Sequence, residues 1–286
     1  YMLSDNPMEA DMFKTYIGSE NGNYLYRNNY CLPLGYMMDE DAVAEWEEAP
    51  SNRLGSLNAF AKALGCEETM LKHADCEMET VAGDTAIDIA EDGYYYADYT
   101  TCNSDSLNVN RSDGWNKEYS KTTHRYLLGL GKCKAGDRIH ISNTNMETIY
   151  FSVYKLNTDV VEQCYNTLDR QTMTLTNMTD RTVEGTIDVK DEGRLVLSIP
   201  ADAGWKLYVD GEETEITPLF DALIGVHLTE GSHTIRLCYT TPWLKEGALI
   251  SAGAIVLFAI SMVIVHRRAL RRKVTQIEEE NGEKHE

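Results

Sequence analysis

Apolar and polar residues alternate over much of the chain, and this period of two is typical of half-buried β-strands. From residue 76 to residue 155 the alternation recurs in short runs, one of which places Phe151 and Val153 on a single face. Turn signals such as Asp113-Gly114 separate the runs. Short alternating strands with regular turns predict a β-sandwich or jelly-roll-like unit over residues 76–155.

A second series of alternating runs occupies residues 156–241. It begins with a predicted helix over Thr158–Asp169, which links it to the first series. Trp205 opens one of these runs, and the run ends at Asp210-Gly211, a dipeptide that favours a two-residue hairpin turn. The pattern therefore predicts a second β-sandwich unit after the linking helix. We expect Trp205 to belong to its core, as Phe151 belongs to the core of the first unit.

Residues 1–75 mix the two periods. A strand is predicted over Asn23–Arg27, and apolar residues between Leu54 and Leu64 share one face of a helix that Gly65 can close. A second short helix is predicted around Glu67–His73. These features predict a small mixed α/β segment ahead of the two sandwich units, so that the fold as a whole is mainly β.

One apolar run is of a different kind. Gly247–Val265 carries no charge, and a helix of this length rises roughly 28 Å, which matches the ~30 Å core of a bilayer. The basic cluster His266–Lys273 follows at once, and such clusters remain on the cytoplasmic side. We therefore expect a transmembrane helix over 247–265 and a basic, then acidic, cytoplasmic tail over 266–286. The bulk of the chain before the helix is expected outside the cell membrane.

The start of the chain shows no secretory signal, because Tyr1 and the residues after it have neither a basic region nor an apolar core. An acidic segment this long requires a signal or a preceding membrane span to be carried across a membrane. Two explanations are open: a signal that was removed, or membrane spans upstream in a larger protein. We favour the second, because Tyr1 is not an initiator residue.

The formal net charge of −20 argues against nucleic acid as a partner, because a phosphate backbone would be repelled. Most basic residues near the membrane belong to the tail, so the part outside carries the excess negative charge. Such a surface could attract cations or basic wall components, or it could serve solubility alone. The seven cysteines show no Cys-x-x-Cys spacing. Pairing of Cys66 with Cys76, or of Cys102 with Cys133, stays open because spacing alone does not decide it.

Motifs for nucleotide binding, metal binding or a nucleophilic serine are absent from the sequence. Carboxylates are abundant, but no spacing brings a pair of them together as a glycosidase needs. We therefore assign no catalytic residue, no metal ligand and no cofactor to this chain.

Aromatic residues are the remaining candidates for chemistry. Trp115, Tyr119 and Tyr95 could stack on sugar rings, since Trp115 and Tyr119 lie in a polar stretch and Tyr95 belongs to a run of tyrosines. Alternation along that run places some of its members in the core. Sugar contact and core or rim packing are both open for these three residues.

Several motifs resemble those of one bacterial family. Tyr26–Tyr36 resembles the "tyrosine, asparagine, then Leu-Pro-x-Gly-Tyr" segment of the YfhO family of membrane proteins, and Ser56–Gly65 resembles the helix that follows it, although Leu57 stands where that pattern often has Gln. Further similar segments follow in the family's order: a strand and hairpin at Ile199-Pro200 and Gly204–Gly211, a turn at Gly225–Leu228 and Gly231–His233, and the final span.

The resemblance implies a multi-spanning glycosyltransferase that uses lipid-linked sugars, a family in which some members decorate lipoteichoic acid. Its membrane bundle and catalytic base lie upstream, so this chain resembles the C-terminal outer module and last span. The implied partners are that upstream bundle, membrane lipid and a cell-wall glycan or teichoic-acid-type acceptor. The alternatives are a membrane-anchored carbohydrate-binding or adhesion module and a purely structural lid on the bundle.

Overall fold

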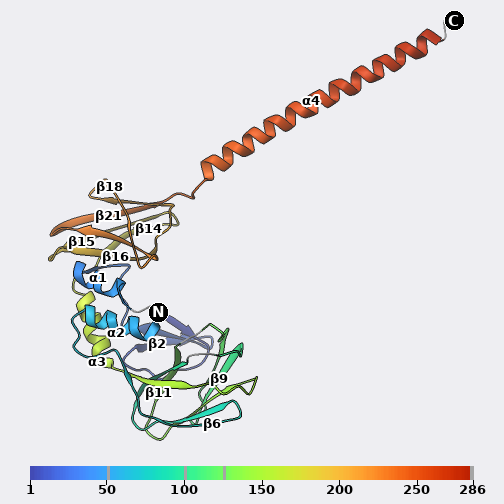
Figure 1. Ribbon diagram of the computed structural model, residues 1–286. Helices are drawn as coiled ribbons and strands as arrows, with labels where there is room; N and C mark the ends of the chain where they lie inside the picture. The colour runs from blue at the N-terminus through green and yellow to red at the C-terminus, as the bar shows by residue number, and fades with distance from the viewer. Residues whose placement is uncertain (50–51, 100–101, 125–126, 284–286) are drawn as a thin grey trace.

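The computed structural model describes residues 1–49, 52–99, 102–124 and 127–283, with side chains as far as Arg268. Two β-sandwiches lie at the two ends of the main body with helices between them, and a long helix leaves the second sandwich on the side away from the first (Figure 1). The mainly β fold predicted from the alternating pattern is confirmed.

The first sandwich packs a sheet of five strands on a sheet of four. The larger sheet has the order β10 (Asn116–Ser120), β9 (Ser106–Arg111), β12 (Arg138–Asn143), β7 (Asp84–Asp88) and β6 (Glu77–Val81). The smaller sheet has the order β11 (Leu128–Cys133), β8 (Gly93–Tyr99), β13 (Phe151–Leu156) and β5 (Leu71–His73). Alternate residues of both sheets face one core, where Phe151 is 8% exposed. The predicted core position of Phe151 is confirmed.

The second sandwich has the same five-plus-four composition. One sheet has the order β14 (Thr174–Met178), β15 (Thr182–Val189), β21 (Gly231–Tyr239), β17 (Trp205–Val209) and β18 (Glu212–Thr214). The other has the order β19 (Thr217–Leu219), β20 (Leu223–Leu228), β16 (Gly193–Pro200) and β4 (Gly35–Met38). Strand β4 comes from the N-terminal segment and pairs with β16, so a strand remote in sequence completes this sheet.

Trp205 lies at one end of the second sandwich. Its ring meets that of Tyr239 edge-on at 5.0 Å between centroids and packs against the core, but Trp205 is only partly buried. Trp205 contacts the core as predicted, but its side chain is not fully buried there. The reason is that Trp205 is the first residue of β17, where the sheet ends. Asp210 and Gly211 have φ of 53° and 89° and join β17 to β18, which confirms the predicted hairpin.

The helices α1 (Glu40–Glu47), α2 (Arg53–Ala63) and α3 (Thr158–Leu168) form the layer between the sandwiches (Figure 1). Asp39 caps α1 and Asn52 caps α2 through side-chain oxygens that accept backbone N–H groups. Together with Leu168 of α3 they cover the outer face of β4 and β16, where Val196 is fully buried. This sheet is therefore buried on both faces, which explains why all four residues of β4 are buried.

The first residues form a separate small sheet with the order β1 (Met2–Ser4), β3 (Asn23–Asn28) and β2 (Lys14–Glu20). Phe13 docks this sheet on the first sandwich, since its ring lies edge-on to Tyr94 with centroids 4.9 Å apart. The strand predicted at Asn23–Arg27 is confirmed. The helix predicted around Glu67–His73 is wrong: Leu71–His73 is β5, because pairing with β13 outweighs local helix preference.

The last element is α4 (Leu244–Glu283). Among the described residues, one helical segment is long and apolar enough to cross a membrane. It is Leu244–Arg268, with a mean hydropathy of 2.7. Its apolar side chains, such as Leu249 and Phe258, are 74% and 67% exposed, and no part of the apolar window is buried among the described residues. Burial of this surface requires an apolar environment outside the chain itself.

Candidate functional site

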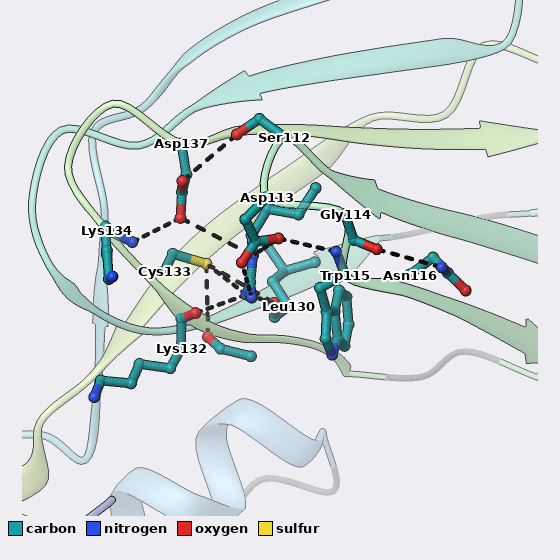
Figure 2. Close-up of polar contacts among 12 residues, drawn as sticks. Ser112, Asp113, Gly114, Trp115, Asn116, Leu130, Lys132, Cys133, Lys134 and Asp137 are labelled. Atoms are coloured by element: carbon teal, nitrogen blue, oxygen red, sulfur yellow. Dashed lines mark hydrogen bonds and ion pairs between the residues drawn. The ribbon is translucent and has the colours of Figure 1, made fainter. Parts of the chain in front are cut away.

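The predicted aromatic residue Trp115 follows the hairpin turn between β9 and β10. The Asp113 carboxylate accepts the Trp115 N–H at 2.9 Å, and Gly114, with φ of 93°, takes the left-handed conformation that this turn requires. The Arg111 N–H donates to the Trp115 carbonyl at 2.8 Å. The turn therefore holds Arg111 and Trp115 beside each other at the edge of the sandwich. Figure 2 shows Asp113, Gly114 and Trp115 of this turn with their polar contacts.

Arg111 has a side chain that is only 9% exposed. Its Nε and Nη2 donate to the two carboxylate oxygens of Asp113 at 2.9 and 2.6 Å. Its Nη1 donates to the carbonyls of Lys132 at 2.6 Å and Leu130 at 3.3 Å, both in β11. The guanidinium, with the Trp115 N–H, lowers the pKa of the Asp113 carboxyl to about 2. Arg111 thus ties the hairpin of one sheet to the edge of the opposite sheet.

Strand β11 is shaped to receive these groups. It has a bulge between Gly129 and Gly131, and Gly131 has φ of 82°. A Cβ at Gly131 would lie 3.3 Å from Arg111 Nη1. The Tyr119 hydroxyl donates to the Gly129 carbonyl at 2.7 Å. Arg111 and Tyr119 therefore satisfy backbone carbonyls at the edge of the sheet, where β11 has no second partner strand among the described residues.

Trp115 and Tyr119 are brought to the same edge and are both partly buried. The Arg111 guanidinium carbon lies 5.1 Å from the centre of the Trp115 ring, and Lys117 Nζ lies 4.6 Å from that of Tyr119. Each ring is thus held by a cation–π contact. In addition, the Trp115 backbone accepts the Arg111 N–H, and the Tyr119 hydroxyl donates to Gly129. Part of each ring remains accessible to solvent, and a sugar could contact that part. The predicted sugar contact therefore depends on these two residues.

Tyr95 lies on β8, inside the first sandwich. It is 3% exposed, and its hydroxyl donates to the Glu91 carbonyl at 3.0 Å. Burial raises the pKa of Tyr95 to about 12. The residue contributes to the wall of a cavity of about 520 Å³, in which Lys155 and Glu91 already pair at 2.6 Å. Tyr95 is therefore enclosed in the core cluster against which Trp115 and Tyr119 pack, and it differs from them in being fully buried.

Sequence reasoning missed Arg111. The available signal was its position two residues before the turn residue Asp113. Nothing local shows that its guanidinium reaches carbonyls that lie 19 and 21 residues further along the chain. Within the described residues, no group of three or more His, Cys, Asp or Glu side chains is arranged to hold a metal ion.

A second polar cluster joins two turns of the second sandwich. His233 Nδ1 lies 2.8 Å from Asp210 Oδ2, and its Nε2 lies 3.0 Å from the Thr229 carbonyl. Both partners only accept hydrogen bonds, so the two contacts favour the doubly protonated ring, and the Asp210 hydrogen bond raises the pKa of His233. Asp210 also accepts the Thr234 N–H at 2.8 Å. The cluster is an ion pair that fixes the β17–β18 turn against the β20–β21 turn.

The joint between the second sandwich and α4 is short. Residues 240–243 separate the end of β21 from the start of α4. The Thr240 N–H donates to the Gly204 carbonyl at 2.9 Å, and a Cβ at Gly204 would lie 2.5 Å from the Tyr239 ring. Trp243, which is 79% exposed, precedes the apolar helix. The sandwich is therefore held close to the start of the helix by fixed backbone contacts.

The fold and the joint define a β-rich module carried on one apolar helix, which is the class of a membrane-attached protein. The chain belongs to the YfhO family, since the family model described as bacterial membrane protein YfhO matches residues 4–251. This match confirms the resemblance drawn from the motifs. Comparison with curated proteins finds no match.

Solved structures give only weak similarities. One is a cupin 2 conserved barrel domain protein from Leptotrichia buccalis, with 13% identity over 59% of this chain and 91% of that chain and a TM-score of 0.15. Another is a quercetin 2,3-dioxygenase from Acinetobacter baumannii, with 8% identity over 64% and 77% of the two chains and a TM-score of 0.14. TM-scores this low carry no argument about this chain.

Proposed function

We propose that this chain is the extracytoplasmic C-terminal module and last membrane span of a cell-envelope glycosyltransferase that uses a lipid-linked sugar. In this proposal the module itself carries no catalytic residue. The catalytic helices precede it in the same protein and form the bundle against which its span packs. The module positions an acceptor, a cell-wall glycan or a teichoic-acid-type polymer, above the bilayer.

The observation that carries this proposal is the short joint between the second sandwich and α4. With residues 240–243 as the connection, the second sandwich stays at the bilayer surface when α4 spans the membrane. Trp243 then lies at the level of the lipid headgroups, where tryptophan is enriched. The helical layer holds the first sandwich at the far end (Figure 1), so an acceptor bound there is kept at a fixed height.

The orientation in this proposal follows from charge. Arg267 to Lys273 form the basic cluster after the apolar run, and such clusters stay in the cytoplasm. The sandwiches are then outside the cell. Their side of the span carries the negative charge that gives the chain its net charge of −20.

Electrostatics also constrains the acceptor. An acidic module repels a phosphate-bearing polymer, and salt screens this repulsion. Binding of such a polymer should therefore strengthen as salt is added, whereas binding of a neutral glycan should not respond. In either case we expect the contact at Trp115 and Tyr119, because their rings lie at one exposed edge of the first sandwich.

The experiment has two arms. Purified chain in detergent is incubated with lipid-phosphate sugar donors and wall-polymer acceptors, and we expect no transferred label. Turnover that disappears when one of its own carboxylates is replaced would overturn the non-catalytic role.

In the second arm, acceptor binding by the chain is compared with that of Trp115→Ala. Tyr150→Ala is the matched control, since Tyr150 is a 79% exposed aromatic on the same sandwich. We expect weaker binding only for Trp115→Ala. Equal acceptor binding by Trp115→Ala and Tyr150→Ala would contradict acceptor contact at this edge. If neither the unchanged chain nor either variant binds the acceptor, acceptor positioning by the module is contradicted.

A further inference from the structure

Two thiols far apart in sequence meet in the helical layer. Cys66 Sγ and Cys164 Sγ lie 3.6 Å apart although 98 residues separate them. Both residues are buried, with 5% and 4% of their surfaces exposed. All seven cysteines are free in this structure, so neither Cys66–Cys76 nor Cys102–Cys133 is formed. Among the cysteines of the described chain, no other thiol–thiol contact occurs.

Local structure fixes the position of each thiol. Cys66 follows Gly65, whose φ of 80° ends α2. The Cys66 N–H donates to the Ala61 carbonyl at 3.0 Å, and the Gly65 N–H donates to the Lys62 carbonyl at 2.9 Å. This pair of bonds is a Schellman motif, which sets the direction of the chain after the helix. Cys66 therefore leaves α2 at a defined angle.

Cys164 belongs to the buried face of α3, together with Val160 and Leu168. The spacing of four residues keeps these three side chains on one side of the helix. Val160 and Cys164 pack with Ala61 and Cys66 in one small apolar cluster. The two sulfurs thus face each other across a contact between α2 and α3 that is dry and already formed.

We propose that Cys66 and Cys164 are a disulfide site that cross-links α2 to α3. In the reaction two S–H bonds break and one S–S bond forms. The two electrons and two protons pass to a disulfide oxidant, which is reduced to two thiols. The sulfurs must approach from 3.6 Å to about 2.05 Å.

The cross-link would act on the layer that connects the two sandwiches. Strand β4 of the second sandwich leads through α1 to α2, and α3 follows the strand β13 of the first sandwich. A covalent bond between α2 and α3 therefore closes a long loop that contains the whole first sandwich. It would hold the first sandwich in its position relative to the second.

Burial decides when the bond forms. Burial and the neighbouring Cys66 raise the pKa of the Cys164 thiol, and an oxidant cannot reach either sulfur while α2 and α3 are packed. The reaction needs a thiolate and an open path. We expect the bond to form quickly during folding and slowly once the reduced chain has folded.

The test is peptide mapping of the full chain under non-reducing conditions. The chain is refolded with oxidised glutathione as the oxidant, its remaining thiols are blocked in denaturant, and it is digested. We expect one cross-linked peptide containing Cys66 and Cys164, and five blocked cysteines. Recovery of both cysteines as blocked thiols, or a link from either of them to Cys76 or Cys102, would overturn the proposal.

Variants keep the test decisive. Cys66→Ser should leave Cys164 as a blocked thiol and create no new link, and Cys102→Ser should leave the Cys66–Cys164 link unchanged. If Cys66→Ser fails to fold, the reduced wild-type chain gives a second measurement. Oxidation of that folded chain should be at least tenfold slower than during refolding, and equal rates would contradict the burial on which the argument rests.

Discussion

His233 and Asp210 form an ion pair in which Nδ1 lies 2.8 Å from Oδ2. The second ring nitrogen of His233 lies 3.0 Å from the Thr229 carbonyl. Since a neutral imidazole can donate only one hydrogen bond, this arrangement stabilises the charged form. One proton therefore holds two turns of the second sandwich together.

We predict that this proton makes stability depend on pH. The Asp210 hydrogen bond raises the pKa of His233 above 6.5, and the Thr234 N–H, with His233, lowers the pKa of Asp210 below 3.8. The His233 contribution is present below pH 6.5 and is lost as pH rises through the raised pKa. The Asp210 contribution is present above pH 3.8 and is lost as pH falls through the lowered pKa.

The measurement is urea unfolding of wild type and His233→Gln at several pH values. The difference in unfolding free energy should be about 1–2 kcal/mol near pH 6 and should shrink toward pH 9. His140→Gln is the control, because the His140 side chain is 46% exposed beside Asp84. A difference for His233→Gln that stays constant from pH 6 to pH 9 would count against an imidazolium.

Replacement of Arg111 by Ala should destabilise the first sandwich by about 2–3 kcal/mol, because it leaves carbonyls of β11 without their donor. Arg138→Ala is the matched control: its side chain is 44% exposed and pairs with Asp88 and Glu79, so about 0–1 kcal/mol is expected. Urea unfolding followed by tryptophan fluorescence measures both. Equal losses in the two variants would show that Arg111 is an ordinary surface arginine.

Trp205→Ala should cost about 3 kcal/mol, the lower end of the range for a buried aromatic, because Trp205 is only partly enclosed. Its lost contact is the one with Tyr239. Trp243→Ala is the control, since Trp243 is 79% exposed and should change stability by less than about 0.5 kcal/mol. A loss below about 1 kcal/mol for Trp205→Ala would remove its packing role and open a role in sugar stacking.

The proposed orientation predicts which cysteines an impermeant thiol reagent reaches on intact cells. Cys31 is exposed on the module and should be labelled. In a Cys31→Ser background, a cysteine introduced at Gln276 in the tail should resist the reagent until the cells are permeabilised. Ready labelling at position 276 on intact cells would reverse the proposed topology.

The sequence alone determined the features that depend on local period. Alternation predicted the two sandwich units and the core position of Phe151, and the uncharged run predicted the apolar part of α4. The Asp210-Gly211 turn followed from the backbone conformations that this dipeptide tolerates. In each case neighbouring residues contain the whole signal.

Tertiary structure decided the features that depend on distant partners. Strand β4 joins β16, Arg111 reaches β11, Tyr95 faces the core, and Cys66 meets Cys164. The helix predicted around Glu67–His73 gave way to β5 because Leu71 finds a strand partner in β13. These contacts appear only when segments from about 20 to 162 residues apart are packed together, since their energy comes from shared burial and backbone pairing rather than from the order of neighbouring side chains.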